Sequence, residues 1–547
     1  MVLNLKKTYR NPVIKGFYPD PSACKVDSDY YLVTSSFSYF PGIPVFHSRD
    51  LVNWEQLGHV IDRPEQMPLG PGSFAGGLFA PTIRYHAGLF YVIVQNASMG
   101  DTVSGTNFIF TATDPAGPWS QPVVVEGGGG DPSLFWDDDG KCYIHYSNLQ
   151  MAEQGVDDLG IYLAEIDPVT GKILSEPVYL WKGALENAYS PEAPHIYKIN
   201  GYYYLMIAEG GTEHFHGVTI ARSESLFGPY ECYLGNPILT HHHLSKMYPI
   251  CNVGHAELLE TDSGAWYMVV LASRLVGGYH KNLGRETFLV PVIWEEGWPI
   301  ASPETGRVEW EYPFPNLAEQ PYPVRSNIDD FNKPELDFCW NLIGCPTNRP
   351  YRIADSMLYI RMTAEPICPE MPPFGGPPAP GRDRPAYESK ALGYVARRQE
   401  DPSFIVEAKL HAEVCETKNT AGLCMMQNNF TQIRLELSDS PRGAVLRVVK
   451  ETTDNPFAPY NTEILGEIPA AEQDYVLKIN AREQDFSFYA IDMSGNTMTV
   501  AEHIYGGFMG SESAGGYLGT YIGMFASGNG TESDCEAAFD WFSYSEA

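Results

Sequence analysis

The chain has 547 residues, more than the roughly 250–300 at which one hydrophobic core usually stops growing, so at least two domains are expected. Its 36 Lys and Arg against 68 Asp and Glu give a formal net charge of −32, which repels nucleic-acid phosphates and anionic membranes. A hydrophobic fraction of 44% with 19% charged residues excludes a disordered chain.

Composition also favours strands over helices. Aromatic residues make up 13% of the chain, with 34 Tyr, and 51 Gly and 43 Pro supply turns, so an all-β protein is predicted. No apolar stretch approaches the roughly 20 residues of a membrane-spanning helix, and the N-terminal residues lack the apolar core of a signal peptide. The ten cysteines are scattered without a Cys-x-x-Cys pair, which favours reduced thiols and a cytoplasmic location.

Five segments share one pattern, in which a short polar or Pro-containing motif precedes an apolar strand, a tight turn and an aromatic-rich strand. They begin at Asp20, Ala80, Asp131, Ala193 and His255, with steps of 60, 51, 62 and 62 residues. Each segment reads as a β-hairpin, and each step has room for one four-stranded blade. The sequence therefore predicts a five-bladed β-propeller over residues 1–310.

The repeats end in a Pro-spaced stretch, which we interpret as a linker at residues 311–326. Beyond it, segments such as Phe404–Leu410 and Ile433–Leu437 alternate apolar and polar residues with a period of two. This pattern is typical of a β-sandwich, which we expect to occupy residues 327–547.

Three acids occur in the motifs that open the repeats: Asp20, Asp131 and Glu192. The innermost strand of each propeller blade starts near the central axis, so these motifs should converge on one mouth of the channel. For any one of them, ordinary turn chemistry is the alternative explanation. Three acids at similar offsets in the repeats favour a shared pocket.

Hydrolysis of a glycosidic bond needs an acid that protonates the leaving oxygen and a carboxylate that activates water or attacks carbon. Glu192 lies between prolines, where burial would raise its pKa, and is the candidate general acid. Asp20, from a blade almost opposite, is the candidate general base. Asp131 follows four glycines and is expected to bias the protonation of Glu192 through its charge.

The chain resembles glycoside hydrolase family 43, especially its two-domain β-xylosidases, nearly from end to end. The resemblance rests on Tyr18–Ser22, Ser35–Gly42, His47–Trp54, Gly130–Phe135, Pro191–His195, Glu209–Thr212 and Leu283–Thr287, and on Asp329–Phe331 and Phe539–Phe542 of a lectin-like sandwich. It implies an inverting, metal-independent mechanism with Asp20 as base, Asp131 as pKa modulator and Glu192 as acid. No cofactor is required, although a structural cation near the propeller axis is compatible with the pattern.

The same resemblance implies five substrate-binding residues. Arg285 would bind the terminal sugar, and a structural ion pair is its alternative role. His255 would lie under the pocket floor, where it orients Asp20 or water or helps to hold a cation, unless it is only a buried, satisfied histidine. Phe37 and Phe79 would form aromatic walls, although Phe37 also fits a generic core position, and Tyr521 would close the pocket from the sandwich.

The leading hypothesis is an exo-acting glycosidase that removes terminal xylose from β-1,4-xylooligosaccharides by inversion. An α-L-arabinofuranosidase, or an enzyme with both activities, is the nearest alternative, because the two sugars present similar hydroxyl patterns. A sugar-binding propeller without catalysis is the alternative of another class. The expected partner is a small neutral oligosaccharide, with no nucleic acid and no membrane, and a homo-oligomer is compatible with the sequence.

Overall fold

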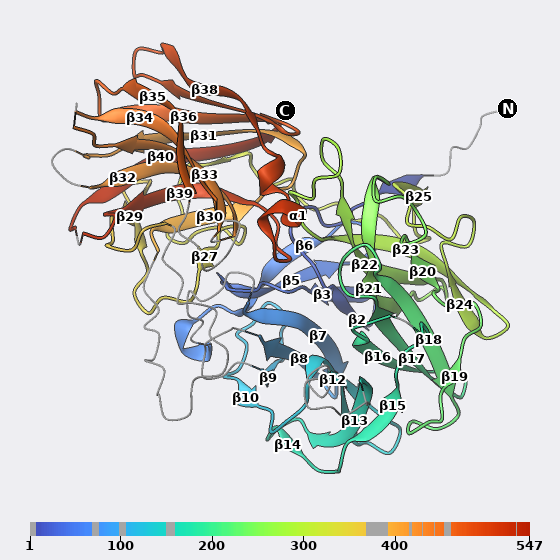
Figure 1. The fold of residues 1–547 in the computed structure, drawn as a ribbon. Coiled ribbons are helices and arrows are strands. Elements are labelled where there is room, and N and C mark those ends of the chain that lie inside the picture. Colours follow the sequence, from blue (N-terminus) through green and yellow to red (C-terminus); the bar gives the residue numbers. More distant parts are fainter. Residues whose placement is uncertain are drawn as a thin grey trace.

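A computed structural model describes residues 7–67, 76–97, 105–148, 159–186, 188–367, 392–414, 418–428, 430–441, 443–452, 461–531 and 533–547. The described residues are almost all strands and loops, with short 3-10 turns at Pro64–Gln66 (η1) and Gly507–Met509 (η3) and one short helix at Ser511–Ala514 (α1). This strand content confirms the predicted all-β class. The chain forms two lobes (Figure 1). Within these ranges, no helix is long and apolar enough to span a membrane, and eight cysteines are free thiols.

The first lobe contains five antiparallel sheets, the blades of a propeller. Blade 1 is β2 (Ser22–Val26), β3 (Asp29–Val33), β5 (Gly42–Ser48) and β6 (Glu55–Ile61). Blade 2 is β7 (Leu78–His86), β8 (Leu89–Asn96), β9 (Thr106–Ala112) and β10 (Val123–Val124). Blade 3 is β11 (Gly130–Trp136), β12 (Cys142–Asn148), β13 (Gly160–Asp167), β14 (Lys172–Ile173) and β15 (Val178–Trp181).

Blade 4 is β16 (Glu192–Ile199), β17 (Tyr202–Glu209), β18 (Gly217–Ser223), β19 (Glu231–Cys232) and β20 (Leu239–Thr240). Blade 5 is β21 (Ile250–Glu260), β22 (Trp266–Arg274), β23 (Glu286–Glu295) and β24 (Trp298–Ala301). The innermost strands β2, β7, β11, β16 and β21 contact one another in sequence, and β2 also contacts β21, which closes the ring. A further pair joins β1 (Thr8–Arg10) to β25 (Glu311–Pro313), so the first residues of the predicted linker pair with the start of the propeller.

A residue in the left-handed backbone region, called the opening residue here, lies just before or within each innermost strand, at the start of the sequence repeat. These residues are Asp20 (φ 57°), Ala80 (φ 43°), Asp131 (φ 48°), Ala193 (φ 51°) and His255 (φ 46°). The pairing register shifts at this point in β7, β11, β16 and β21. Such irregularities bend the strand and redirect individual side chains, and non-glycine residues rarely adopt this conformation. The five openings are therefore structurally equivalent, as the sequence repeat predicts.

A buried ion pair between Arg84 and Glu257 lies at the propeller axis. Each of the two residues lies two to four positions after the opening residue of its strand. Arg84 Nη2 lies 2.8 Å from Glu257 Oε1 and donates to Ser133 Oγ at 3.0 Å. Ser22 Oγ donates to Glu257 Oε2 at 2.6 Å, and Tyr197 donates to Oε1 at 3.4 Å. The side chains of this network come from all five innermost strands, so its hydrogen bonds connect the five blades.

The second lobe is a sandwich of two antiparallel sheets. One consists of β26 (Ile328–Asp329), β28 (Tyr351–Ala354), β29 (Met357–Arg361), β31 (Ser403–His411), β36 (Asp474–Arg482), β37 (Asp485–Ile491), β38 (Thr497–Tyr505) and β40 (Glu536–Glu546). The other consists of β30 (Tyr394–Arg398), β32 (Thr420–Asn428), β33 (Thr431–Ser438), β34 (Val445–Thr452), β35 (Asn461–Pro469) and β39 (Tyr521–Ser527). Alternating apolar residues of both sheets form the core between them.

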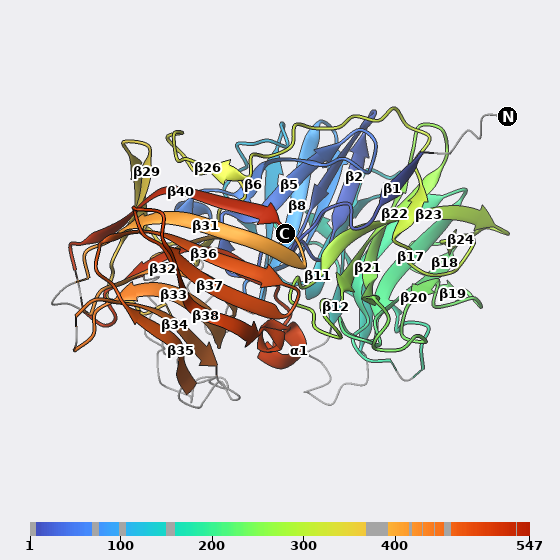
Figure 2. The same cartoon turned by 90° about the horizontal axis from the view of Figure 1, so that it is seen from above.

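The sandwich lies beside blade 1 of the propeller (Figure 2) and also contacts the loop between β22 and β23 of blade 5. A two-residue strand, β4 (Tyr39–Phe40), pairs with β27 (Leu342–Ile343) across the junction. The buried Arg398 donates from Nε to the carbonyl of Phe17 at 2.7 Å, and the amide of Thr520 donates to the carbonyl of Asn282 at 2.8 Å. The junction thus combines strand pairing with a buried guanidinium, which fixes the sandwich beside the channel.

We expect Glu257→Ala to lower the free energy of unfolding of the propeller by about 3–5 kcal/mol, because Arg84 would be left as an unpaired charge in a buried network. Urea-induced unfolding followed by tryptophan fluorescence measures this change. Asp262→Ala is the control, because it removes an exposed ion pair with Lys25, which contributes about 0–1 kcal/mol. Equal effects of the two substitutions would contradict a structural role for the axial pair.

Candidate active site

The structure brings the three predicted acids together at one mouth of the propeller channel. Asp20 lies two residues before β2, Asp131 lies near the start of β11, and Glu192 begins β16. Asp131 Oδ2 accepts a hydrogen bond from the amide of Ala193, next to Glu192, at 3.0 Å. The charges of Asp20 and Asp131 both act on Glu192, so the three carboxyl groups behave as one electrostatic cluster.

Asp20 is held as a carboxylate by its neighbours. Its Oδ1 accepts a hydrogen bond from Arg285 Nη1 at 2.7 Å, its Oδ2 accepts one from Ser35 Oγ at 2.6 Å, and His255 Nδ1 lies 3.7 Å from Oδ1. Burial alone would raise the pKa of Asp20, but Arg285, His255 and Ser35 outweigh burial and lower the pKa below its usual value. Asp20 is therefore ionised over the ordinary pH range.

Glu192 has the opposite protonation preference. Burial is the largest effect, and the negative charges of Asp131 and Asp20 add to it, so the pKa of Glu192 lies well above its usual value despite the opposing charge of Arg285. Burial and Asp20 also raise the pKa of Asp131, against the lowering effect of His255 and the Ala193 hydrogen bond. The site therefore pairs an ionised acid, Asp20, with a carboxyl group that retains its proton, Glu192.

Backbone contacts between blades hold these acids in place. Ser35 Oγ, which donates to Asp20, accepts a hydrogen bond from the amide of Ala80 in blade 2 at 2.7 Å. Ser147 Oγ of blade 3 donates to the carbonyl of Pro191, directly before Glu192, at 2.5 Å. Each acid is thus tied to a neighbouring blade, and its position depends on the closed ring.

Arg285 occupies the predicted place beside the acids. Besides Asp20, its Nη1 donates to Thr212 Oγ1 at 3.0 Å, and its Nη2 makes a long contact of 3.5 Å with the carbonyl of Tyr517. The structural ion pair considered as its alternative role is therefore present, with Asp20 as the partner. Arg285 joins blade 5, blade 4 and the sandwich at the site, so it can also orient a sugar bound there.

His255 is buried below Asp20, and its ring lies 6.4 Å from that of His195. Another histidine, His216, lies nearby and was not predicted. Its ring packs against Gly254, where a Cβ would stand 2.4 Å from the ring, and burial lowers the pKa of His216 to about 3. Neutral His216 therefore adds no positive charge to the site, and Gly254 leaves room for it.

The predicted aromatic residues differ in their accessibility. Phe37 is only 1% exposed and packs between Phe17 and Phe79, with ring centroids 5.3 and 4.6 Å away, while Arg285 lies 5.8 Å from its centroid. Phe79 is partly exposed. Phe37 therefore supports Phe79 and Arg285 from behind, and Phe79 is the ring with surface available to a ligand.

The expectation that Tyr521 closes the pocket is wrong in this structure. Tyr521 has 0% exposure and stacks on Tyr39 with ring centroids 3.7 Å apart, because β39 turns this side chain into the junction between the lobes. The sandwich residue beside Arg285 is instead Tyr517, which is 46% exposed and lies on the loop before β39. The Gly-rich sequence Gly515-Gly516 before Tyr517 was the available sign of an exposed loop.

Two other unpredicted residues, Ser35 and Thr212, contact the acid cluster directly or through Arg285. Both lie in motifs that carry the family resemblance, but their hydrogen bonds depend on the packing of different blades. Among the described residues, no group of three or more His, Cys, Asp and Glu side chains is arranged to hold a metal ion. The axial cation that the sequence allowed for stays a prediction.

Paired carboxyl groups with opposite protonation preferences at the mouth of a propeller are what acid-base hydrolysis of a glycosidic bond requires. Comparison with protein families agrees with this chemistry: residues 9–299 match the model for glycosyl hydrolases family 43, and residues 328–545 match the beta xylosidase C-terminal concanavalin A-like domain. The chain belongs to glycosyl hydrolases family 43. The resemblance expected from the sequence motifs is thereby confirmed.

Relatives and solved structures match over nearly the whole chain. A xylosidase/arabinosidase of Butyrivibrio fibrisolvens is 39% identical over 98% of this chain and 99% of that protein. A non-reducing end alpha-L-arabinofuranosidase of Bacteroides ovatus is 37% identical over 98% of this chain and 95% of that protein. The crystal structure of a xylan beta-1,4-xylosidase from Bacillus halodurans C-125 superposes with a TM-score of 0.88 at 30% identity, over 98% and 100% of the two chains. The propeller-plus-sandwich architecture is thus shared along the full length.

Replacing Asp131 by Asn should lower the pKa of Glu192, because one of the two negative charges that raise it is removed while an oxygen remains to accept the Ala193 hydrogen bond. Glu192 would then lose its proton at a lower pH than in the unmodified protein, yet above the usual value, since burial persists. A carbon-13 NMR titration of the Glu192 carboxyl measures its pKa in the unmodified protein and in the Asp131→Asn variant. An unchanged pKa would contradict electrostatic coupling between the two acids.

Proposed function

We propose that the protein is an inverting, exo-acting glycosidase that removes terminal xylose from β-1,4-xylooligosaccharides. Glu192 is the general acid, Asp20 the general base, and Asp131 the residue that keeps Glu192 protonated. The observation that carries this proposal is the opposite protonation preference of Asp20 and Glu192 within one cluster of carboxyl groups. Hydrolysis by inversion needs one carboxyl group of each kind at the start of the reaction.

In the proposed reaction, the Glu192 carboxyl group donates its proton to the glycosidic oxygen as the bond from that oxygen to the anomeric carbon breaks. Asp20 removes a proton from a water molecule as its oxygen attacks the anomeric carbon from the opposite face. The cycle leaves Glu192 ionised and Asp20 protonated, and proton exchange with solvent restores both. Asp131 favours the return of the proton to Glu192, because its charge disfavours a second carboxylate nearby.

Arg285 is the proposed ligand of the terminal sugar, with Thr212 and Asp20 holding its guanidinium in place. His255 is proposed to orient Asp20 from below, and Phe79 offers a partly exposed ring to one face of the sugar. A closed channel floor and a mouth bordered by the sandwich suit a substrate end rather than the middle of a polymer. The proposed substrate is therefore a short neutral oligosaccharide.

Activity on α-L-arabinofuranosides is the second candidate, alone or beside xylosidase activity. Its support is the naming of the relatives: one is a xylosidase/arabinosidase and another a non-reducing end alpha-L-arabinofuranosidase, at 39% and 37% identity. The same acid cluster serves both sugars, so the choice depends on the sugar-binding walls. Cytoplasmic location, the absence of a required cofactor and assembly into a homo-oligomer stay predictions from the sequence.

Glu192→Ala should reduce hydrolysis of xylobiose by about 10²–10⁴-fold, because its sugar leaving group needs protonation. The rate of nitrophenyl xyloside hydrolysis should fall much less, since nitrophenolate leaves without a proton. Asp20→Ala should lose activity on both substrates, because both need an activated water. Steady-state kinetics on the two substrates separates these patterns.

Glu186→Ala is the control, because Glu186 is an exposed acid on the same segment as Glu192; it should hydrolyse both substrates at the unmodified rate. An equal loss of activity on both substrates in the Glu192→Ala variant would contradict leaving-group protonation by Glu192. A non-catalytic sugar-binding propeller would bind xylobiose without hydrolysing it, in the unmodified protein as in the variants.

We expect nitrophenyl β-xyloside to be cleaved with a higher kcat/KM than nitrophenyl α-L-arabinofuranoside, and the first product to be α-xylose, since inversion converts a β-linkage into an α-anomer. Parallel kinetics ranks the two sugars, and proton NMR in the first minutes identifies the anomer. A preference for arabinofuranoside would make the second candidate the main activity. Initial release of β-xylose would refute inversion.

A further inference from the structure

A second cavity lies at the opposite end of the innermost propeller strands from the acid cluster. It has a volume of about 710 Å³ and is lined by residues from the far ends of the five strands: Ala23–Lys25, Arg84–His86, Leu134–Trp136, Ile196–Asn200 and Glu257–Glu260, with Trp266 and Trp294. Each strand enters the cavity at least three residues after its left-handed opening residue at the acid cluster, or two after His255 in β21. The cavity therefore lies at the other mouth of the channel from the acid cluster.

The axial network lies between the acid cluster and this second cavity. Ser22 and Ser133 lie two residues beyond Asp20 and Asp131, and their hydroxyl groups bond to Glu257 and Arg84. Glu257 lines the second cavity and is only 2% exposed, because Arg84, Ser22 and Tyr197 contact its carboxylate. A ligand in this cavity would thus not reach the catalytic acids through the channel.

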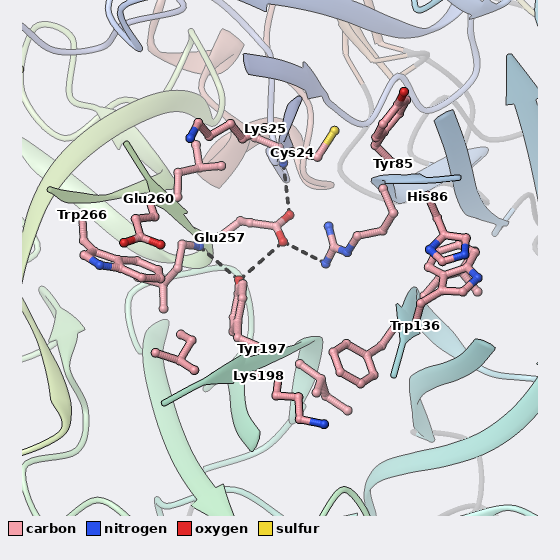
Figure 3. Close-up of a pocket in the computed structure, with 18 of the residues that line it drawn as sticks. Cys24, Lys25, Tyr85, His86, Trp136, Tyr197, Lys198, Glu257, Glu260 and Trp266 are labelled. Atoms are coloured by element: carbon pink, nitrogen blue, oxygen red, sulfur yellow. Dashed lines mark hydrogen bonds and ion pairs between the residues drawn. The ribbon is translucent and has the colours of Figure 1, made fainter. Parts of the chain in front are cut away.

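Aromatic side chains form opposite walls of the cavity (Figure 3). Trp266 lies on one side, beside Glu260. On the other side Trp136 stacks on His86 with ring centroids 4.8 Å apart, and Tyr85 is 40% exposed. Trp136 and Trp266 each keep part of their surface exposed, so two rigid aromatic surfaces are available across one hollow.

The basic groups around the cavity are neutralised by acids of the chain. Lys25 pairs with Asp262, Lys198 pairs with Asp137 at 2.7 Å, and Arg84 pairs with Glu257. An anionic ligand would have to displace these acids, so the cavity favours a neutral one. Glu260 at the rim and the Tyr197 hydroxyl near the floor supply polar atoms along the walls.

We propose that this cavity is a second binding site for short neutral oligosaccharides, separate from the catalytic site. Sugar rings combine apolar faces, which stack on aromatic rings, with hydroxyl groups at their edges, which bond to carboxylates and hydroxyls. The cavity presents both features, and its volume lies within the roughly 300–1,000 Å³ of typical ligand sites. Binding there would hold substrate on the enzyme without occupying the acid cluster.

Isothermal titration with xylotriose tests the proposal in a Glu192→Gln background, where hydrolysis is suppressed. We expect Trp136→Ala and Trp266→Ala each to weaken binding at the second site by at least about tenfold, so that the titration no longer detects it, because each removes a stacking surface. Tyr179→Ala is the matched control: Tyr179 is 42% exposed on β15 and does not line the cavity. In the unmodified background, nitrophenyl xyloside kinetics reports whether each variant is folded.

The expected result is two xylotriose sites in the parent and control proteins, one site in each tryptophan variant, and unchanged nitrophenyl xyloside kinetics in all of them. If xylotriose fails to bind the acid cluster, the parent shows one site and the tryptophan variants show none, which still supports the second site. Unchanged stoichiometry and affinity in both folded tryptophan variants would overturn the proposal.

Discussion

The left-handed residue at the start of each sequence repeat is the constraint on which the site depends. In blades 1 and 3 this residue is itself an acid, Asp20 or Asp131, and in blade 4 it is Ala193, directly after Glu192. Regular pairing would alternate side chains between the two faces of a blade. The bulge interrupts that alternation at one level of the channel, so chain segments 61 to 172 residues apart contribute side chains to the same small volume.

Bringing three carboxyl groups into a buried volume makes their full ionisation costly, and the neighbouring side chains decide which group keeps its proton. Arg285 and His255 come from blade 5, the neighbour of blade 1 in the closed ring, and contact Asp20. Glu192, in blade 4, has no comparable ion pair among the described residues and experiences the charges of both aspartates. The division into base and acid therefore follows from the order of the blades around the axis.

The repeat and the acid cluster could be predicted because both are written into short motifs with regular spacing. The positions chosen as repeat starts, from Asp20 to His255, are the same residues that adopt positive φ. Contacts that depend on packing between distant segments could not be predicted in this way. Ser35 reaches the site because blade 2 supplies the amide of Ala80, and Tyr521 is buried because the sandwich docks on Tyr39 of blade 1. Neither the pairing of blades nor the docking of the two lobes is encoded in a local pattern.

The same innermost strands serve two environments, and the Arg84–Glu257 network explains how they remain separate. A buried ion pair costs desolvation energy and is retained where its hydrogen bonds are satisfied. Here, residues of all five innermost strands supply partners, and the pair contributes no net charge at the axis. A lone cation at this position would lower the pKa of Glu192, whereas a lone carboxylate would raise the pKa of Asp20. The paired arrangement instead leaves the acid cluster under the control of Arg285 and Asp131, and it supplies a neutral floor to the cavity at the opposite mouth.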